Sequence, residues 1–308
     1  MTNTPLRYPG GKSLMTDFFT RFISENQLRN TIYAEPYCGG AGAGINLLLN
    51  DSIDELWLND ASSAIYSFWY SIKHLGDEFL RLFDETEVTL SEWFLQKKVF
   101  ENTDLKTNDG LLKKGFATFF LNRTNRSGII DAGPIGGQTI PSQENANYKI
   151  DARFNKINLR PKLEKIIGLS DRIQVFNLDA LDFLSVLKNP IPKYQKHDFF
   201  VYLDPPYYTQ GSSLYLNYYD KKDHESISKF LKQNELNFKW ILSYDSVKPI
   251  RELYSEFRTY NFYLNYHVQE SKMGKELLVY SKNSQIPKNL VLKYIKASKK
   301  KIELIKAS

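Results

Sequence analysis

The chain contains very little cysteine and histidine. One cysteine, Cys38, and four histidines occur among 308 residues. A single thiol excludes an internal disulfide framework, and four scattered imidazoles give no basis for a structural zinc site. We therefore expect no bound metal.

The chain also lacks a long apolar run. No segment approaches the roughly 20 apolar residues that a membrane-spanning helix requires. The N-terminal residues 1–5 have no signal-peptide pattern. With 42% hydrophobic and 25% charged residues, the composition is that of a globular protein. We expect a cytoplasmic location and no membrane partner.

Positive charge is concentrated in two segments. The formal net charge is +6, yet residues 282–308 alone carry eight lysines and one glutamate. A second basic segment, residues 111–172, has eleven Lys or Arg and five Asp or Glu. Such patches favour polyanions, nucleic acid above all, although a solvated basic surface has the same composition.

The segment Leu203-Asp204-Pro205-Pro206-Tyr207-Tyr208 follows an apolar run, 199–202, which predicts a buried strand. Two consecutive prolines end the strand in a rigid turn. The turn lies at the carboxyl end of the expected strand, and open α/β sheets bind ligands at the carboxyl ends of their strands. The Asp204 carboxylate and the backbone carbonyls of this turn can accept hydrogen bonds, and the Tyr207 ring lies next to them in the sequence. Together they suit a planar amine such as a nucleobase. Taken alone, the same residues also fit a Pro-Pro turn with a capping aspartate.

A glycine-rich segment lies earlier in the chain. A strand over 31–35 leads into Glu35-Pro36-Tyr37-Cys38-Gly39-Gly40-Ala41-Gly42, and a helix is expected over 43–49. Glycines allow positive φ and a close approach to a nucleotide-like ligand. The next strand, 55–60, ends in Asp60, where nucleotide-binding folds place an acid for ribose hydroxyls. Asp60 could equally cap the helix that follows.

The N-terminal segment Leu6-Arg7-Tyr8-Pro9-Gly10-Gly11-Lys12-Ser13 combines a tight turn with the start of a helix expected over 14–23. Lys12 and the free amides of the helix start suit an anion or a carboxylate. The spacing of a Walker loop is absent. A plain loop before a helix is the alternative.

Residues 61–172 interrupt the alternation of strands and helices. Helices are expected over 62–75, 91–102 and 111–122, followed by a long irregular segment that reaches residue 162. It begins with Asn122, Arg123, Asn125 and Arg126, whose side-chain types contact phosphates and base edges. We expect a hairpin-like finger that reads nucleic acid. A flexible loop over a helical cap is the alternative.

The alternation resumes after residue 172. Strands are expected over 173–178, 199–203 and 240–244, with helices over 180–187, 223–235 and 246–254. Two final strands, 262–267 and 276–280, suit an antiparallel hairpin with residues 271–275 at its tip. The lysine-rich residues after 282 fit either a helix or a mobile tail.

Together these segments resemble the Dam-type adenine-specific DNA methyltransferases, which use S-adenosylmethionine. Tyr37 stands where many members have Phe, and Tyr8-Pro9 where some have Trp-Ala. Asn122-Arg123 and the Ser-Gly that follows resemble the start of the family's DNA-recognition region. The other matching segments are Arg7–Lys12, Glu35–Gly42, Asn59-Asp60, Leu203–Tyr207 and Lys275-Glu276-Leu277-Leu278.

The resemblance implies an α/β fold: a Rossmann-like, mostly parallel sheet with an antiparallel C-terminal hairpin and an inserted, mainly helical recognition domain. The catalytic domain would comprise residues 1–60 and 173–283, the DNA-recognition domain 61–172, and a lysine-rich tail 284–308.

The resemblance also assigns roles to residues. Tyr8 and Lys12 would contact the cofactor, with Lys12 near its carboxylate. Glu35, Pro36, Tyr37, Gly39 and Gly40 would surround its methionine part. Asp60 would hold the ribose, and Asp179 would lie near the cofactor's adenine. Asp204, Pro205, Pro206 and Tyr207 would be the catalytic residues, with Asp204 also beside the cofactor. Asn122, Arg123, Asn125 and Arg126 would bind DNA.

The expected chemistry is transfer of a methyl group to an adenine amino group. Asp204 and the Pro205 carbonyl can accept hydrogen bonds from that amino group, and Tyr207 can stack on an extruded base. The sulfonium donor is already activated, so transfer depends mainly on positioning. The expected partner is double-stranded DNA. The enzyme is expected to be a monomer, either paired with a cognate restriction endonuclease or acting as a solitary methylase.

Other activities share parts of this pattern. A cytosine-amino methyltransferase more often has Ser in place of Asp204, and an RNA adenine methyltransferase would have the same catalytic motif. A catalytically silent DNA-binding relative would not need the intact Asp204–Tyr207 motif. A dinucleotide oxidoreductase would leave the Pro-Pro motif without a role.

Overall fold

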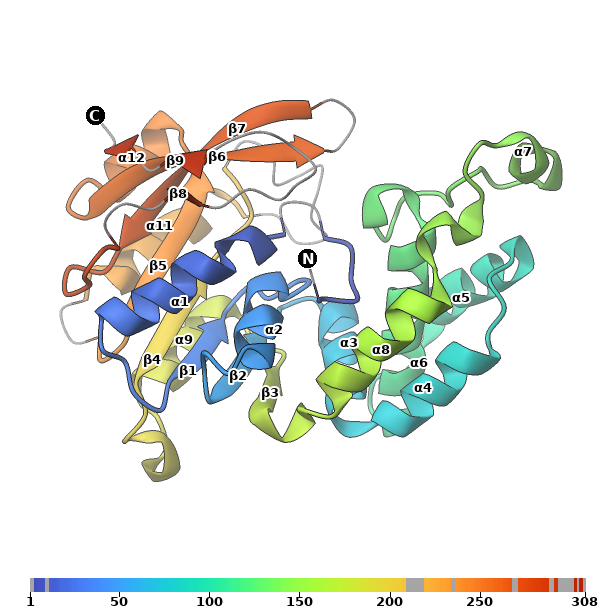
Figure 1. Ribbon diagram of the computed structural model, residues 1–308, viewed down its shortest axis with the longest axis horizontal. Helices are drawn as coiled ribbons and strands as arrows, with labels where there is room; N and C mark the ends of the chain where they lie inside the picture. The colour runs from blue at the N-terminus through green and yellow to red at the C-terminus, as the bar shows by residue number, and fades with distance from the viewer. Residues whose placement is uncertain are drawn as a thin grey trace.

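A computed structural model describes residues 3–8, 11–208, 219–233, 236–267 and 271–287, together with the short pairs 291–292, 302–303 and 305–306. Its centre is an eight-stranded mixed sheet of order β10-β6-β7-β5-β4-β1-β2-β3 (Figure 1). The strands are β1 (Ile32–Glu35), β2 (Glu55–Asn59), β3 (Ile173–Phe176), β4 (Phe199–Leu203), β5 (Lys239–Asp245), β6 (Arg258–His267), β7 (Ser271–Tyr280) and β10 (Ile305–Lys306).

The first five strands are parallel, and the last three run antiparallel to their neighbours. The strand order reverses between β1 and β4: the chain moves outward to β2 and β3 on one side and to β5 and β7 on the other. Ligand sites of open sheets lie at the carboxyl edge of such a switch point. The predicted Rossmann-like sheet with a terminal hairpin is confirmed.

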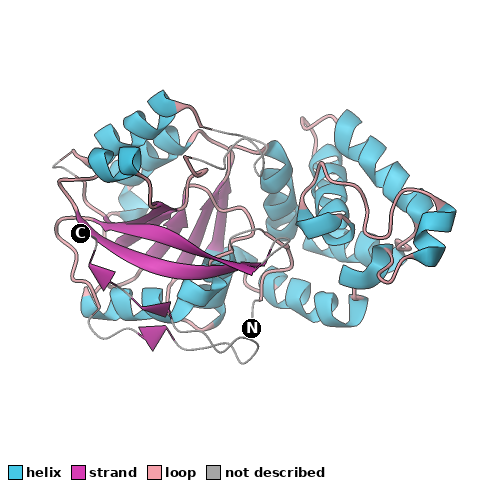
Figure 2. Ribbon diagram, turned by 90° about the horizontal axis from the view of Figure 1, so that it is seen from above, coloured by secondary structure: helices cyan, strands magenta, loops and turns pink. Residues whose placement is uncertain are grey.

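Helices cover both faces of the sheet (Figure 2). Helices α1 (Thr16–Glu25) and α2 (Gly42–Leu49) lie on one face, and α9 (Ala180–Lys188), α11 (Lys221–Leu231) and α12 (Lys248–Leu253) lie on the other. Strand residues alternate between the two cores: Tyr33 packs with Phe19 of α1, whereas Ile32 and Ala34 belong to the opposite core. This period of two is expected of a sheet covered on both sides.

A helical segment lies at one end of the sheet (Figure 1). Its core is aromatic, with Phe68, Phe79 and Phe119 in mutual ring contact. This core is continuous with the α1 face of the sheet, because α3 packs against both β3 and α6. The helices are α3 (Ser63–His74), α4 (Gly76–Glu85), α5 (Leu90–Asn102), α6 (Asn108–Thr124), α7 (Ile140–Asn145) and α8 (Lys156–Ile167).

The three helices predicted in this segment are present, but α4, α7 and α8 were not predicted. Helix α8 contains Pro161, which sequence rules treat as a helix breaker. Tertiary packing of Leu159, Leu163 and Ile166 overrides that preference. The irregular region is therefore shorter than expected. In place of a hairpin-like finger, the structure has one isolated bridge, Asn125 with Pro134.

The end of the chain also differs from expectation. Residues 271–275 lie within β7 and not at a hairpin tip, since β6 and β7 pair from Arg258–Tyr280 to His267–Ser271. In the lysine-rich tail, the described pairs Val291–Leu292 (β8), Ile302–Glu303 (β9) and β10 are extended, so of the two alternatives the helix does not hold for these pairs. Residues 9–10 and 209–218 lie outside the described residues. In the part that is described, no helix is long and apolar enough to cross a membrane.

Candidate active site

Asp204 follows β4 directly, at the carboxyl edge of the sheet. Pro205 and Pro206 are buried, whereas Asp204 is partly exposed. The Ser243 hydroxyl, from β5, donates to Asp204 Oδ1 at 2.6 Å. Lys12 Nζ donates to both carboxylate oxygens, at 3.0 and 2.8 Å. The Asp204 carboxylate is therefore fixed by a cation and a hydroxyl from two other segments.

Lys12 is the centre of this cluster. It is 6% exposed, and its ammonium also donates to the Tyr207 hydroxyl at 3.1 Å. It lies 3.8 Å from Glu276 Oε2, and Tyr207 in turn donates to Glu276 Oε1. The prediction placed Lys12 near a cofactor carboxylate. The structure gives its ammonium a different partner, the Asp204 carboxylate.

The alternation of side chains along the strands explains why these groups meet. Glu35 shares a face of β1 with Tyr33, Ser243 shares a face of β5 with Ile241, and Glu276 shares a face of β7 with Leu278. All three apolar partners belong to the core under α1. The polar residues thus lie on one face, near the carboxyl ends of the parallel strands.

Sequence reasoning missed Ser243 and the role of Glu276. An acid directly after a strand marks the carboxyl edge only where the strand is parallel. In the antiparallel β7, the first half of the strand lies at the carboxyl edge of the parallel strands, as the pairing of Glu276 with Asp245 shows. The sequence signal for this role was Glu276 itself, a charged residue on the face of 276–280 that is otherwise apolar.

The charges of the cluster are strongly coupled. Burial alone would lower the pKa of Lys12, but Asp204 and Glu276 stabilise the ammonium and raise its pKa well above the ordinary value. Burial is the main cause that raises the pKa of Glu276 to about 7; Lys12 opposes this effect and Asp204 adds to it. One cation thus faces two carboxylates, the partly exposed Asp204 and the buried Glu276, and the pKa of Glu276 lies near neutrality.

The glycine-rich loop contacts the N-terminal segment. Gly39 has a φ of 42°, and a Cβ built there would lie 2.6 Å from Tyr8 Cζ. The Tyr8 ring therefore lies directly against the loop. The resemblance assigned Tyr8 to cofactor contact, which stays a prediction. The Trp69 indole, from α3, donates to the Gly39 carbonyl at 2.9 Å and fixes the loop from the other side.

Asp60 fastens the same loop. Its carboxylate accepts from the Gly39 amide and the Ser62 amide, both at 2.9 Å. Burial is the main cause that raises its pKa to about 6. A carboxylate has about four acceptor positions, so two remain for ligand hydroxyls. The helix-start and ligand interpretations of Asp60 are therefore compatible.

Asn59 joins three strand ends, a role that sequence reasoning did not assign. It is fully buried, and its amide nitrogen donates to the carbonyls of Pro36 and Leu178 at 2.9 and 3.1 Å. Its oxygen accepts from the Leu178 amide at 2.9 Å. This one side chain therefore links the ends of β1, β2 and β3, which pair through their backbones.

Tyr37 and Asp179 lie at the same edge. The Tyr37 hydroxyl is 3.0 Å from that of Tyr219, and the rings make an edge contact at 5.9 Å. Asp179 is exposed and caps α9 by accepting from the Leu181 amide at 2.8 Å. The capping bond leaves acceptor positions on Asp179, so the structure leaves the adenine assignment a prediction.

Two of the four predicted DNA-binding residues have internal roles. Asn122 is 3% exposed: it accepts from the Arg7 amide at 2.7 Å and donates to the Arg7 and Gly128 carbonyls. Asn125 is fully buried and accepts from the Trp93 indole at 2.6 Å. Their burial corrects the expectation that they contact DNA, since all their hydrogen-bonding groups are already used. Arg126 is exposed, and Arg123 is partly exposed.

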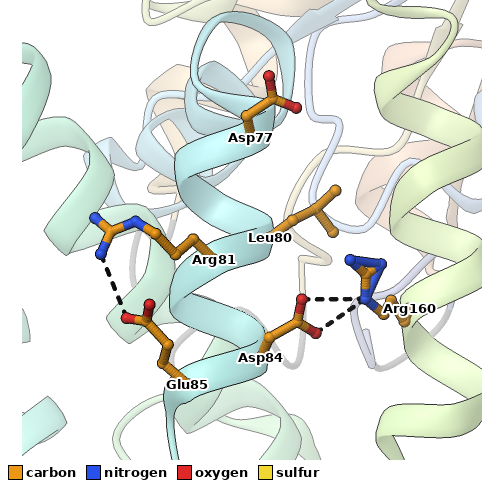
Figure 3. A pocket seen from close by; sticks show the side chains of 6 residues that line it. All are labelled: Asp77, Leu80, Arg81, Asp84, Glu85 and Arg160. Atoms are coloured by element: carbon orange, nitrogen blue, oxygen red, sulfur yellow. Dashed lines mark hydrogen bonds and ion pairs between the residues drawn. The ribbon is translucent and has the colours of Figure 1, made fainter.

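A surface hollow between α4 and α8 is lined by Asp77, Leu80, Arg81, Asp84, Glu85 and Arg160 (Figure 3). Four of its charges are paired: Arg160 Nε lies 2.9 Å from Asp84 Oδ1, and Arg81 lies 3.3 Å from Glu85. The Arg160–Asp84 pair joins α8 to α4, the Arg81–Glu85 pair lies within α4, and such exposed pairs contribute little energy. Among the described residues there is no group of three or more potential metal ligands.

The fold and the cluster at the sheet edge define a Rossmann-like methyltransferase architecture. The model of the D12 class N6 adenine-specific DNA methyltransferase family matches residues 8–268. The chain belongs to this family and is an adenine-specific DNA methyltransferase. A comparison with curated protein sequences finds no match.

Proposed function

We propose that this enzyme transfers a methyl group from S-adenosylmethionine to the exocyclic amino group of an adenine flipped out of duplex DNA. The observation that carries the proposal is the position of Asp204. It lies at the carboxyl edge between the glycine loop and β5, and its oxygens are fixed by Lys12 and Ser243. The same proposal includes two settings for this activity: a restriction-modification system with a cognate endonuclease as partner, or a solitary methylase.

The Asp204 carboxylate would act as a hydrogen-bond acceptor. The lone pair of an adenine amino group is delocalised into the ring, which makes the nitrogen a poor nucleophile. Hydrogen bonds to Asp204 and to the Pro205 carbonyl favour a more tetrahedral nitrogen whose lone pair points at the methyl donor. Tyr207 offers a ring for the extruded base, whose removal from the stack costs a few kcal/mol.

The described residues fit a nucleoside cofactor with a charged amino-acid end. The loop backbone at Gly39 and Gly40 has no Cβ, and Asp60 retains acceptor positions beside it. Tyr8 packs against the loop, and Glu35 lies beneath it, accepting from the Gly44 amide at 3.2 Å. When bound, S-adenosylmethionine supplies the electrophilic methyl group. The residues of the chain hold it and orient the acceptor.

Gly39→Ala is expected to weaken cofactor binding by about tenfold or more, since one methyl group would collide with Tyr8 and φ is positive. Calorimetric titration with S-adenosylmethionine measures the effect. Gly168→Ala is the control: a Cβ there meets the Glu164 carbonyl at 3.3 Å and no nearer atom. Unchanged affinity in Gly39→Ala would show that the Tyr8 contact is not part of the cofactor site.

A cluster of arginines is the best candidate for contact with DNA phosphates. Burial, then the positive charges of Arg7 and Arg153, lower the pKa of Arg123 to about 10. Within the described part of the chain, none of these three arginines forms an ion pair with a carboxylate. Arg7 directly precedes Tyr8, so the cluster lies where the helical segment meets the cofactor loop. Phosphates would neutralise this repulsion.

Arg123→Gln is expected to weaken DNA binding by about tenfold and to reduce its salt dependence, because one phosphate contact is lost. Fluorescence anisotropy with a labelled duplex at several salt concentrations measures both quantities. Arg81→Gln, on the exposed surface of α4, removes the same charge from the same helical segment and should change neither. Equal affinity and equal salt slope for Arg123→Gln would exclude the cluster from the DNA interface.

An RNA substrate is the alternative that the catalytic cluster itself does not exclude. Incubation with radiolabelled S-adenosylmethionine and either duplex DNA or structured RNA separates the two substrates. We expect label in DNA, and sequencing of the methylated positions would give the recognition site. Label in RNA alone would contradict the proposal.

A further inference from the structure

Glu276 is a buried carboxylate with one unused oxygen. The residue is 1% exposed. Its Oε1 accepts from the Tyr207 hydroxyl, but its buried Oε2 has no hydrogen-bond partner. An unsatisfied buried acceptor is uncommon in folded proteins and requires an explanation. The nearest cation is Lys12, whose Nζ lies 3.8 Å away, beyond hydrogen-bonding distance.

Lys12 presently occupies the acceptor that the substrate requires. It donates to both oxygens of Asp204, and Ser243 donates to one of them. A neutral adenine amino group is a weaker donor than an ammonium, so it competes poorly for the same carboxylate. The bonds that fix Asp204 in the free protein therefore also reduce its capacity to orient a substrate.

A movement of Lys12 by about 1 Å would satisfy Glu276 Oε2 and free an acceptor on Asp204. The distance follows because charged hydrogen bonds are about 2.7–2.9 Å long, whereas Lys12 Nζ now lies 3.8 Å from Glu276 Oε2. The ammonium would then bond to Glu276 Oε2 and leave Asp204 Oδ2 open. Its bond to Tyr207 can persist, because Tyr207 is already bonded to Glu276. A lysine stem is flexible enough for such a shift.

We propose that Glu276 is a positioning residue that orients the Tyr207 hydroxyl and receives the Lys12 ammonium when a substrate amino group bonds to Asp204. The proposal rests on the proposed methyl transfer and adds a second counter-ion to its site. Glu276 acts through Lys12 and Tyr207 and does not touch the base.

Glu276→Gln keeps the shape of the side chain and removes the charge that would receive Lys12. With saturating DNA and cofactor, the single-turnover rate of methyl transfer should fall by about tenfold to a hundredfold. The dissociation constants of DNA and cofactor should stay within about threefold of wild type. Glu256→Gln, at an exposed position paired with Lys232 at 3.1 Å, removes the same charge and should leave the rate unchanged.

The pH dependence of the rate gives a second readout. The charged and titratable groups that face Glu276 are Lys12, Asp204, Tyr207, Tyr202 and Asp245. Burial, the largest cause, raises the pKa of Glu276 to about 7, so its ionised form is gained as the pH rises through neutrality. The wild-type rate should therefore rise with pH around 7. The rise should be absent in Glu276→Gln and present, at a lower rate, in Glu276→Asp.

A double variant distinguishes this role from a purely structural one. If Glu276 acts mainly through Lys12, then Glu276→Gln should change the rate of a Lys12→Met enzyme by less than about threefold. Full additivity of the two effects would overturn the proposal. So would a wild-type rate and pH profile in Glu276→Gln, or weaker binding with an unchanged transfer rate.

Failure of Glu276→Gln to fold and failure of the proposed function are distinguished from failure of the role of Glu276. Should Glu276→Gln fail to fold, Glu276→Asp carries the test: a reduced rate with the pH rise retained supports the role, and a wild-type rate contradicts it. A wild-type enzyme that methylates no DNA would contradict the proposed function itself. An active wild type with an unaffected Glu276→Gln would contradict only the role of Glu276.

Discussion

Replacing Asp204 with alanine should lower the rate of methyl transfer by about a thousandfold or more, the scale seen when a preorganised hydrogen-bonding group is removed from an active site. The substitution removes the acceptor that orients the amino group. It also removes the partner of Lys12 and of Ser243. DNA affinity should change little, because the arginine cluster that we assign to phosphate contact lies elsewhere.

The measurement is a single-turnover assay with labelled cofactor, with DNA affinity determined on the same preparations. Asp204→Asn is the matched variant: it keeps the volume and one acceptor oxygen but loses the charge that balances Lys12. Its rate should also fall strongly. Asp54→Asn, at an exposed position, is the control. An Asp204→Ala enzyme with a wild-type rate would refute the assigned role.

Replacing Lys12 with methionine should reduce both stability and activity. Methionine fills a similar volume but leaves two carboxylates near one another without a cation. Breaking a buried ion pair costs about 3–5 kcal/mol, and we expect the lower end because Asp204 is partly exposed. Urea unfolding of the variant and of the wild type measures the difference.

The loss of stability caused by Lys12→Met should become smaller as the pH falls. Without Lys12, the pKa of Glu276 can only rise above its value of about 7, so the folded variant takes up a proton there on acidification. That proton removes one of the two opposing charges. The difference in free energy of unfolding should therefore be smaller at pH 6 than at pH 8. A pH-independent difference would show that Glu276 does not face Lys12, and Lys113→Met, from an exposed pair, is the control.

Much of the fold followed from the sequence because its signals were local. Apolar runs located the parallel strands, and the Pro-Pro turn and the glycines located the carboxyl edge. The resemblance assigned Tyr8 to the cofactor, and its packing against the glycine loop came from the structure alone. Helices α4 and α8 were missed because two or three buried residues stabilise each through tertiary contacts, and Pro161 masked the second.

The contacts between the residues of the site could be predicted from the sequence less well than the residues themselves. Lys12 and Asp204 are 192 residues apart, and no local pattern reveals that their side chains meet. Asn122 and Asn125 have side chains typical of base contact, yet Asn122 bonds the backbone of Arg7 and Asn125 bonds the Trp93 indole. Residue type alone does not separate a polar group that faces solvent from one that satisfies buried amides and carbonyls.

The most direct test of the central claim is nucleoside analysis by mass spectrometry of duplex DNA incubated with the protein and S-adenosylmethionine. We predict N6-methyladenine with the wild-type enzyme and almost none with Asp204→Asn. Methylation of cytosine only, or N6-methyladenine formed equally by both proteins, would contradict the account of how Asp204 selects and orients an adenine amino group.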